Sequence, residues 1–555
     1  MPFDWQPREP DARRARGYVN AGFWNDETLG SILATGLRAV PEHAFTVRSE
    51  RFPFRGTFRD VDARACRVAA GLRARGIGPG DAVAFQLPNW VDAAAAFYAI
   101  AYLGAVVVPI VHFYGAKEVG YILRRTRVKA LVTADRFGHQ DFVANLDAIR
   151  AEGGVPDLEW VAVVGDSVAV GPPGGTFAFS DLLEHGSLDA PVAVDPMAPA
   201  LIAYTSGTTA DPKGVVHVHR TINAEIRQLS SIQPNQQAPA DDPAAIDMIT
   251  GAPVGHGIGM LAALLTPVFR RRNVHLIDVW DPTRVLAAMV EDHLSAGQGA
   301  TFFLTSLLDH PDFDPAVHGP LMAHIGLGGA AVPVAVCERA RAIGIECLRS
   351  FGCTEHPSIT GSTFEDPWDQ RAKTDGRPLA GVEMRLVDED GRDVGVGEPG
   401  EIISRGPDCF FGYTDPARTA ECFDSDGWYA TGDVGVLDEA GCLSITDRKK
   451  DIIIRGGENI SAQEVEELIA RLPGVAECAV VAAPDPRLGE HAAVFVRMQA
   501  GFDDPSLGAV RSHLDAAGLA RQKWPEEVRS VEEFPRTPSG KVQKFVLRAR
   551  LSEQS

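Results

Sequence analysis

Helical and strand-like hydrophobic patterns alternate along the first two thirds of the chain. Residues 64–87 (RACRVAAGLRARGIGPGDAVAFQL) place apolar positions at helical spacing up to Gly76, and a GPGD turn and an apolar strand pattern follow. Residues 118–134 repeat this order. We expect it again where the helical pattern of residues 285–294 precedes the apolar run ATFFLT at 300–305. Strands separated by helices of this length predict mostly parallel sheets that helices cover.

One apolar run, AAAAFYAIAYLGAVVVPI at residues 93–110, reaches the length of a membrane span. Its many alanines are only weakly apolar, Gly104 and Pro109 interrupt it, and no basic cluster flanks it. We therefore expect a buried helix that leads into a buried strand, and no integral membrane segment.

The pattern changes near residue 383. Short alternating strands with DEDG and GEPG turns predict an antiparallel sheet from there. Further along the chain come a strand, a helix over 461–472, strands over 476–484 and 491–498, and another helix. This order is typical of a small, independent α+β domain.

The sequence therefore predicts an α/β fold. A large N-terminal domain of helix-covered mixed or parallel sheets carries a β-rich subdomain, and a small mobile α+β domain follows it. The predicted boundaries are 1–447 for the large domain, about 383–446 for its β-rich subdomain, 448–450 for a hinge and 451–555 for the small domain.

Composition narrows the class of protein. At 555 residues, with 45% hydrophobic and 23% charged residues, the chain is typical of a soluble globular protein of more than one domain. The net charge of −21 disfavours nonspecific binding to nucleic acid or anionic membranes, so a local site must hold any anionic ligand. The eight cysteines form no CxxC pair, and neither terminus has the pattern of a targeting signal. We expect a cytoplasmic protein without a nucleic-acid partner.

The stretch YTSGTTADPKG at residues 204–214 has the chemistry of a phosphate-binding loop. Small residues let backbone N–H groups surround an anion, hydroxyl groups add donors, and the lysine adds charge. The spacing differs from that of a Walker A loop. Taken alone, a polar surface loop is the better interpretation. The candidate phosphate-binding residues are Thr205, Ser206, Gly207, Thr208, Thr209 and Lys213.

Six further motifs follow this loop in order. They are LGGAAVP at 327–333, FGCTE at 351–355, GRPLAG at 376–381, GWYATGD at 427–433, DRKKDIIIRGGENISAQEVE at 447–466 and PRTPSGK at 535–541. The series resembles the adenylate-forming superfamily of acyl-CoA synthetases, peptide-synthetase adenylation domains and firefly-type luciferases. The resemblance extends from about Thr57 to Leu547. It implies that a carboxylate attacks the α-phosphate of ATP to give an acyl-adenylate, from which a thiol then displaces AMP.

The resemblance implies roles for residues around ATP. Thr354 would contact the α-phosphate, and Glu355 would hold a Mg²⁺ ion that bridges phosphate oxygens. A Thr-Glu pair otherwise commonly starts a helix. Asp433 would accept hydrogen bonds from the ribose hydroxyls with help from Arg448; otherwise they would be a turn residue and a member of a surface ion pair. The adenine-binding residues would be Gly328, Gly329, Ala330, Phe351, which replaces the usual tyrosine, and Gly352.

The resemblance also assigns residues to the small domain and its motion. Lys541 would bridge the substrate carboxylate and the α-phosphate during adenylation, although a lysine in a PSGK turn is usually just solvated. Lys450 would be the hinge, where the backbone absorbs the rotation of the small domain between half-reactions. Gly456 and Gly457 would border a tunnel for the pantetheine arm of CoA, where a side chain would block the thiol. Without the resemblance, RKK at 448–450 would be interpreted as a solvated linker and GG at 456–457 as a turn.

Histidines and the acyl pocket complete the candidate site. His256, in APVGHGIGM, matches the family motif at the carboxylate end of the acyl pocket, and Ala331 and His356 would also contact the acyl group. His217 and His219 lack a third ligand nearby and are better interpreted as core or surface residues than as metal ligands. Ala210 stands where the family usually has glycine, which predicts an altered affinity for ATP.

These observations predict an AMP-forming carboxylate–CoA ligase that uses ATP, Mg²⁺ and CoA. No arginine or lysine near the predicted acyl pocket could hold a second carboxylate, which favours a monocarboxylic acid with an apolar body, whether fatty, alicyclic, aromatic or steroid. The alternatives are an adenylation enzyme that loads a separate carrier protein and a catalytically silent nucleotide- or acyl-adenylate-binding protein. A luciferase-type oxidation is the least favoured. The sequence leaves the oligomeric state open, a homodimer included.

Overall fold

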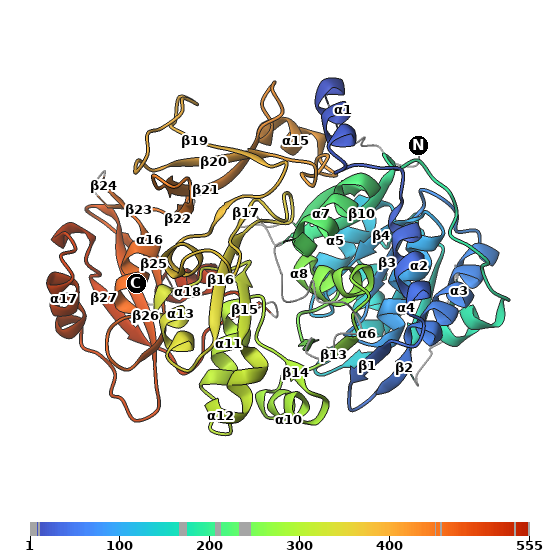
Figure 1. The fold of residues 1–555 in the computed structure, drawn as a ribbon, viewed down its shortest axis with the longest axis horizontal. Helices are drawn as coiled ribbons and strands as arrows, with labels where there is room; N and C mark the ends of the chain where they lie inside the picture. Colours follow the sequence, from blue (N-terminus) through green and yellow to red (C-terminus); the bar gives the residue numbers. More distant parts are fainter. Residues whose placement is uncertain are drawn as a thin grey trace.

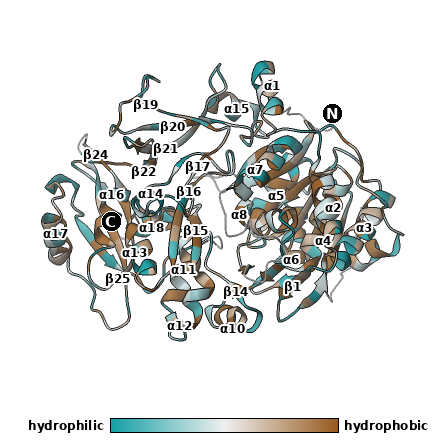
Figure 2. Ribbon diagram, in the orientation of Figure 1, coloured by the Kyte–Doolittle hydropathy of each residue, from teal (hydrophilic) through white to brown (hydrophobic). Residues whose placement is uncertain are grey.

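The computed structural model of the chain has a mixed α/β architecture, as predicted (Figure 1). A large N-terminal part holds several helix-covered sheets, and a small α+β part lies at the C-terminal end of the ribbon. Hydrophobic residues concentrate on the inner strands and on the helix faces that cover them (Figure 2). The structure describes residues 8, 11–165, 175–205, 212–231, 246–449, 451–455, 458–537 and 540–552.

The largest sheet has seven strands, in the order β11-β10-β4-β3-β5-β8-β9. All neighbours are parallel except β10 and β11, which form an antiparallel pair. The bounds are β3 Ala82–Gln86, β4 Val106–Pro109, β5 Ala130–Ala134, β8 Trp160–Val164, β9 Thr176–Ala178, β10 Pro199–Thr205 and β11 Lys213–Val218. A two-stranded pair, β6 (Arg136–Phe137) and β7 (Gln140–Asp141), lies outside this sheet.

Helices cover both faces of this sheet because alternate strand residues point to opposite sides. Val83 and Phe85 belong to one core cluster, which includes residues of α2, α3, α4 and α7. Ala82 and Ala84 belong to another, which includes residues of α5 and α6. The helices are α1 Ala12–Asn20, α2 Leu29–Ala39, α3 Phe58–Ala74, α4 Val91–Tyr102, α5 Ala116–Thr126, α6 Phe142–Ala151 and α7 His219–Ser231, with a 3₁₀ turn over Phe179–Glu184.

The apolar run at 93–110 forms most of α4 and all of β4, and every residue of both is buried. The expected order of helix and strand is therefore confirmed there, as it is for α3 with β3 and for α5 with β5. Gly76 ends the first of these helices with a φ of +85°, which only glycine adopts readily. No helix among the described residues is long and apolar enough to cross a bilayer.

A second, five-stranded sheet has the order β14-β12-β13-β1-β2. Its strands are β1 Ala44–Arg48, β2 Phe54–Thr57, β12 Asp247–Thr250, β13 Val274–Ile277 and β14 Leu294–Ser295. The connection from β12 to β13 is one helical stretch in three parts, with α8 over Gly257–Met260, a π-helical turn over Leu261–Leu265 and α9 over Thr266–Phe269. The wide turn lies just before Pro267, which has no N–H to donate to a regular helix.

The expected strand at 300–305 is wrong. After α10 (Pro282–Asp292) and the short β14, residues Thr301–Leu308 form α11. A short apolar run fits either a buried strand or a buried helix, so periodicity alone does not distinguish them. Burial of Phe303, Leu304, Leu307 and Leu308 on one face resolves the ambiguity in favour of the helix.

Two further sheets build the rest of the large part. The third has the order β15-β16-β17-β18 and the fourth, fully antiparallel as predicted, the order β19-β20-β21-β22. The strands are β15 His324–Gly328, β16 Glu346–Phe351, β17 Thr360–Gly361, β18 Arg377–Pro378, β19 Glu383–Val387, β20 Gly400–Arg405, β21 Tyr429–Leu437 and β22 Leu443–Arg448. The helices are α12 Pro315–His318, α13 Val334–Arg341, α14 Trp368–Lys373 and α15 Pro416–Cys422, with a 3₁₀ turn over Gly319–Met322.

The C-terminal sheet has the order β24-β23-β26-β25, and β27 pairs with β26. Its elements are β23 Ile453–Arg455, β24 Glu458–Ile460, α16 Ala462–Ile469, β25 Val475–Asp485, β26 Gly489–Met498, α17 Leu507–Ala516, a 3₁₀ turn over Arg521–Lys523, β27 Glu527–Ser530 and α18 Lys544–Ser552. The sequence pattern did not predict β27 or α18. Leu547 and Leu551 of α18 are buried against β25 and β26, so contacts distant in sequence define this helix.

One buried ion pair joins the third and fourth sheets. Arg349 of β16 donates from Nε and Nη2 to Oδ1 of Asp375 at 3.1 and 2.9 Å. The Oδ2 atom of Asp375 accepts from the backbone N–H of Ile445 in β22 at 2.9 Å. The backbone N–H of Asp375 donates to Leu443, and its carbonyl accepts from the hydroxyl of Thr360. Asp375 therefore connects β16, β17 and β22.

We expect Arg349→Met to lower the free energy of unfolding by about 3–5 kcal/mol, because it leaves the Asp375 carboxylate buried without its cation. Lys373→Met is the matched control, since Lys373 pairs with Asp369 at 2.6 Å on the surface, and such pairs contribute about 1 kcal/mol or less. The measurement is the shift of the urea midpoint and melting temperature of both variants. Equal shifts would contradict the assigned role of the buried pair.

Candidate active site

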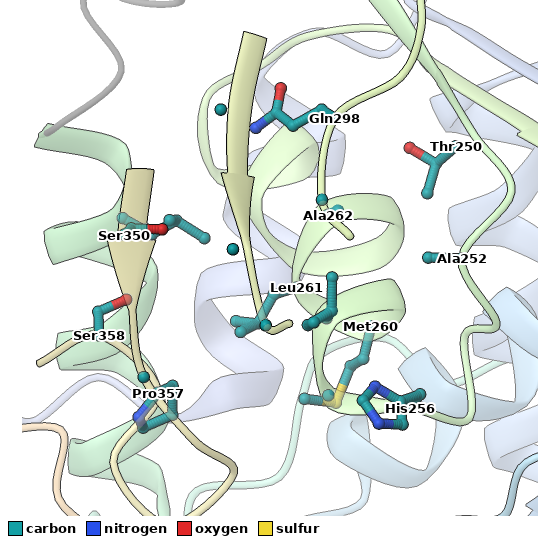
Figure 3. A pocket seen from close by; sticks show the side chains of 18 of the residues that line it. Thr250, Ala252, His256, Met260, Leu261, Ala262, Gln298, Ser350, Pro357 and Ser358 are labelled. Atoms are coloured by element: carbon teal, nitrogen blue, oxygen red, sulfur yellow. The ribbon is translucent and has the colours of Figure 1, made fainter. Parts of the chain in front are cut away.

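A cavity lies where β12, β15 and β16 end, the edge at which open α/β sheets bind ligands. It measures about 1360 Å³, its open mouth included. Figure 3 shows Ser350 and Ser358 on one side of it and Thr250 and His256 on the other. Most of the lining is apolar, and among the described lining residues Lys541 is the only lysine or arginine and Glu225 the only carboxylic acid.

Among the described residues that line the cavity, Lys541 alone comes from the C-terminal part of the chain. Its backbone N–H donates to the hydroxyl of Thr537 at 3.1 Å, and the N–H of Thr537 donates to its carbonyl at 2.8 Å. Gly540 has a φ of +86°, and a side chain there would press on Phe302 of α11. Thr537 and Gly540 thus hold the backbone of Lys541 where its side chain lines the cavity.

Charges of both signs surround the Lys541 ammonium. Burial, followed by the positive charge of Arg448, lowers its pKa to about 8, while Asp433 and Glu355 act in the opposite direction. Arg448 Nε lies 2.7 Å from Asp433 Oδ1, and the two residues face each other across β21 and β22. The ion pair holds the pKa of Arg448 above its usual value. The structure therefore brings Lys541, Asp433, Arg448 and Glu355 together, as their predicted roles require.

Glu355 and Lys213 approach each other through Tyr413. The tyrosine hydroxyl donates to Oε1 of the buried Glu355 at 2.7 Å, and the ammonium of Lys213 lies 5.4 Å from the centre of the tyrosine ring. Lys213 pairs with Thr205 at the end of the β10–β11 hairpin. Burial, followed by the charge of Glu355, raises the pKa of Tyr413. No sequence signal pointed to Tyr413, because the residue lies in no recognised motif.

Several candidate residues lie outside the described part of the chain. The predicted phosphate-binding residues Ser206, Gly207, Thr208 and Thr209 belong to this group, as does Ala210. The same applies to the candidate hinge residue and the two glycines of the expected CoA tunnel, which are Lys450, Gly456 and Gly457.

Phe351 of the FGCTE motif ends β16, and the other four residues belong to an irregular loop that leads to β17, so no helix starts at Thr354. The loop closes on itself because Cys353 and His356 exchange backbone hydrogen bonds of 3.0 and 3.2 Å. His217 of β11 bonds through Nε2 to the carbonyl of Thr354 at 2.8 Å, and burial lowers its pKa to about 4. A neutral His217 thus orients the residue expected to contact the α-phosphate.

His256 occupies the position before α8 and lines the cavity. Burial, followed by the positive charge of Lys541, lowers its pKa to about 3, so the ring is neutral. Its Nδ1 atom is buried and has no hydrogen bond to the described residues. His256 and Lys541 therefore face the same end of the cavity, as the motif match predicts for the carboxylate end.

Glycines allow close approach around the cavity. A side chain on Gly328 would meet Ser350, one on Gly329 would meet Ile258, and one on Gly352 would lie 1.8 Å from the carbonyl of Pro357. All three glycines line the cavity. Ala330 does not line it and packs beside Ala252, Ala300 and Phe303, so its contact with adenine stays a prediction.

Three predicted ligand contacts differ from the structure. Phe351 is buried in a core cluster and does not line the cavity, so stacking on adenine stays a prediction. Ala331 is exposed beside Thr301, outside the cavity lining. His356 is wholly buried behind the loop, where its ring bonds to Ser404 and Asp408 at 2.8 and 3.2 Å. The predicted contact of His356 with the acyl group is wrong because these partners hold the ring away from the cavity.

The comparisons with known proteins agree with this geometry. Residues 37–414 match the model of the AMP-binding enzyme family, and residues 464–541 match that of the AMP-binding enzyme C-terminal domain. A medium-chain fatty-acid–CoA ligase of Escherichia coli (strain K12) is 32% identical over 538 residues, which cover 97% of this chain and 92% of that protein.

A second relative is the 3-[(3aS,4S,7aS)-7a-methyl-1,5-dioxo-octahydro-1H-inden-4-yl]propanoyl:CoA ligase of Rhodococcus jostii (strain RHA1). It is 35% identical over 505 residues, with 89% of this chain and 93% of that protein covered. The crystal structure of ATP-bound MatB from Rhodopseudomonas palustris superposes with a TM-score of 0.80 at 28% identity, and covers 94% of this chain and 99% of that one. The resemblance drawn from the motifs is confirmed: the chain belongs to the AMP-binding enzyme family of adenylate-forming enzymes.

Proposed function

We propose that the protein is an ATP-dependent carboxylate–CoA ligase that acts on a monocarboxylic acid with an apolar body. The observation that carries this proposal is the position of Lys541. A buried ammonium at the end of a largely apolar cavity, beside Arg448 and two carboxylates, is suited to hold two anions against each other. The relatives named above are CoA ligases, which supports a thiol acceptor for the acyl group.

The chemistry follows in two steps. An oxygen of the substrate carboxylate forms a bond to the α-phosphorus of ATP, and pyrophosphate leaves with the electrons of the broken P–O bond. Lys541 offsets the charge on the carboxylate and the α-phosphate, and Thr354 donates to the latter. In the second step the thiol of CoA loses its proton to water and its sulfur forms a bond to the acyl carbon. The bond from this carbon to the phosphate oxygen breaks, and AMP leaves with its electron pair.

Glu355 fits the magnesium site that the family implies. Among the described residues no group of three or more His, Cys, Asp or Glu side chains could hold a metal, so an ion here needs ligands from the nucleotide. Mg²⁺ commonly takes one or two protein carboxylates and completes its shell with phosphate oxygens and water. The ion would neutralise charge on the phosphates, while Glu355 holds it in place with support from Tyr413.

The second step requires the small part of the chain to move, with Lys450 as the hinge and Gly456 and Gly457 beside the CoA thiol. This rotation must open polar contacts between the described residues of the two parts. Glu467 of α16 accepts from the backbone N–H of Val334 at 3.3 Å, and Arg497 lies 3.6 Å from Asp309. At the start of α16, Ser461 and Gln463 donate to backbone carbonyls of β22 at 2.8 and 3.0 Å. Single contacts of this kind contribute about 1 kcal/mol each, so an interface built from them can open once per turnover.

The cavity supports a monocarboxylic substrate. Lys541 is its only described cation, and burial keeps His217 and His256 neutral, so a second carboxylate would lie unpaired among apolar groups. The named relatives act on medium-chain fatty acids and on an octahydroindenyl propanoate. A third relative, the salicyl-AMP ligase / salicyl-S-ArCP synthetase of Mycobacterium tuberculosis (strain ATCC 25618 / H37Rv), is 31% identical over 558 residues. The second half of this relative's name supports a carrier protein as the alternative acceptor of the acyl group.

The first test is pyrophosphate release with ATP and Mg²⁺ over a panel of mono- and dicarboxylic acids, with and without CoA. We expect release with apolar monocarboxylic acids, conversion to acyl-CoA when CoA is present, and little activity with dicarboxylic acids. Lys541→Ala should lower the rate of adenylation by about 100- to 1000-fold, the usual cost of losing one preorganised donor. Lys373→Ala, a surface lysine, should leave the rate unchanged.

The outcomes of this test separate the alternatives. Release of pyrophosphate without any CoA product, but with transfer to a carrier protein, would replace the ligase by a carrier-loading enzyme. ATP binding without release for any acid would indicate a silent binding protein.

The pH dependence of adenylation should report the charge on Lys541. Its pKa is lowered to about 8, so the ammonium loses its proton as the pH rises through 8, and kcat/KM should fall about tenfold per pH unit above that point. The neighbouring Cys353 does not titrate there, because burial raises its pKa well above the usual value. Lys541→Arg stays charged over this pH range. The fall in kcat/KM above pH 8 should therefore be absent from this variant, whose activity is lower overall. A fall that persists in Lys541→Arg would assign the titration to another group.

A further inference from the structure

The end of the cavity remote from the reactive groups carries two polar side chains. Figure 3 shows Gln298 and Thr250 at one end of the cavity and His256 at the other. His256 lies beside Lys541, whose charge acts on it. Gln298 and Thr250 would therefore face the far end of an acid whose carboxylate lies at Lys541.

The third sheet shows how deep this end lies. A Cβ atom on Gly326 would be 3.5 Å from Nε2 of Gln298, and Gly326 pairs with Leu348 of β16. Gly352, which opens the reactive loop, comes four residues after Leu348, which corresponds to about 13 Å of extended chain. The amide of Gln298 is thus well separated from the position of adenylation.

Two glycines hold Gln298 at this place. Gly297 and Gly299, on either side of it, have φ values of +94° and +103°, which residues with side chains rarely adopt. The N–H of Gly299 donates to the carbonyl of Gly326 at 3.0 Å, and its carbonyl accepts from the N–H of Gly328 at 3.0 Å. The backbone around Gln298 is therefore bonded to β15, and it presents a polar side chain at a fixed point of a mostly apolar lining.

Thr250 reaches the same region from a neighbouring strand. β12 pairs in parallel with β14, and Met248 lies opposite Ser295. Thr250 and Gly297 each follow this pair by two residues, so Thr250 leaves the sheet beside the segment that carries Gln298. The two polar side chains therefore belong to one edge of the second sheet.

Both side chains have hydrogen bonds to offer. Neither the amide of Gln298 nor the hydroxyl of Thr250 is bonded to any residue that the structure describes. Other polar groups of the lining are occupied, since the indole N–H of Trp280 donates to the hydroxyl of Ser306 at 2.9 Å. An amide and a hydroxyl can each donate and accept, so together they suit an oxygen atom of a ligand.

A charged group at this end would have no counter-ion among the described lining residues. Lys541, their only lysine or arginine, belongs to the reactive end. Their only carboxylic acid, Glu225, is hydrogen-bonded to Ser358 and Asp408, and burial followed by the charge of Asp408 raises its pKa well above the usual value. Because burying an unpaired charge is costly, the ligand group that fits here is uncharged.

We propose that Gln298 and Thr250 form a polar subsite that binds an uncharged oxygen, a ketone or a hydroxyl, at the end of the acid remote from its carboxylate. This inference rests on the proposed ligase function and narrows its substrates to acids whose apolar body carries such an oxygen. An acid of pure hydrocarbon would cover both side chains and leave them without partners. Sites built to bond a polar group discriminate strongly against analogues that lack it.

The experiment compares kcat/KM for sets of three acids that share one carbon skeleton and carry a ketone, a hydroxyl or no oxygen at the remote end. Linear and alicyclic skeletons of several lengths are used, and the ratio is evaluated on the skeleton with the highest kcat/KM. The wild type should prefer the oxygen-bearing members by about tenfold or more, the ratio that one buried hydrogen bond supplies.

Two variants and a matched control assign this preference to the subsite. Gln298→Met keeps an unbranched side chain without the amide, so it should lose most of the preference while turnover of the hydrocarbon acid stays or rises. Thr250→Val removes only the hydroxyl and should lose part of it. Gln228→Met makes the same change at a glutamine that does not line the cavity, whose amide donates to the carbonyl of Ala380 at 2.9 Å, and should keep the wild-type ratio.

The outcomes separate this inference from the proposed function. A wild type that turns over all three acids equally is a ligase without this subsite, and an unchanged ratio in Gln298→Met leads to the same conclusion. A preference for an acid with an ammonium or a second carboxylate at the remote end would also overturn the inference. If no acid is turned over, the ligase proposal fails, and calorimetric binding of the same acids to wild type and Gln298→Met decides the inference, which equal or absent binding would overturn.

Discussion

The buried pair of Arg349 and Asp375 joins the parts of the molecule that carry the active site. Arg349 belongs to β16, whose end continues into the loop of Thr354 and Glu355, while Asp375 bonds to β22, which ends at Arg448. Arg349 also affects Glu467 of the C-terminal part: burial raises the pKa of Glu467, and the positive charge of Arg349 opposes this rise. An ion pair held this tightly fixes the relative position of strands that share no hydrogen-bonded ladder.

Near this ion pair lie charged side chains of both signs, each of which would be costly to bury alone. Lys541 comes from the C-terminal part, Asp433 and Arg448 from the fourth sheet, and Glu355 from the loop after the third. Because neighbouring charges largely compensate one another, a lysine can remain inside the protein with a pKa only moderately lowered. The same arrangement leaves room for the phosphates of ATP and for a substrate carboxylate, which would provide further negative charge beside Lys541 and Arg448.

The cavity extends from this charged end into an apolar interior with few polar interruptions. The widened helical turn over Leu261–Leu265 forms one wall, and α7 contributes another. Apolar lining gives affinity in proportion to the area buried but selects weakly among hydrocarbon bodies of similar size.

The sequence by itself determined the family and the two-part architecture, and it named the candidate reactive residues. Local signals carry this information: alternating periods define the α/β part, the turns after residue 383 define the antiparallel sheet, and ordered motifs name Lys541 and Asp433. Only the tertiary structure decided that residues 300–305 are helical, that His356 is hidden, and that Glu225 faces the cavity. Glu225 and Ser358 lie 133 positions apart, so their burial and partnership depend on packing that no local pattern encodes.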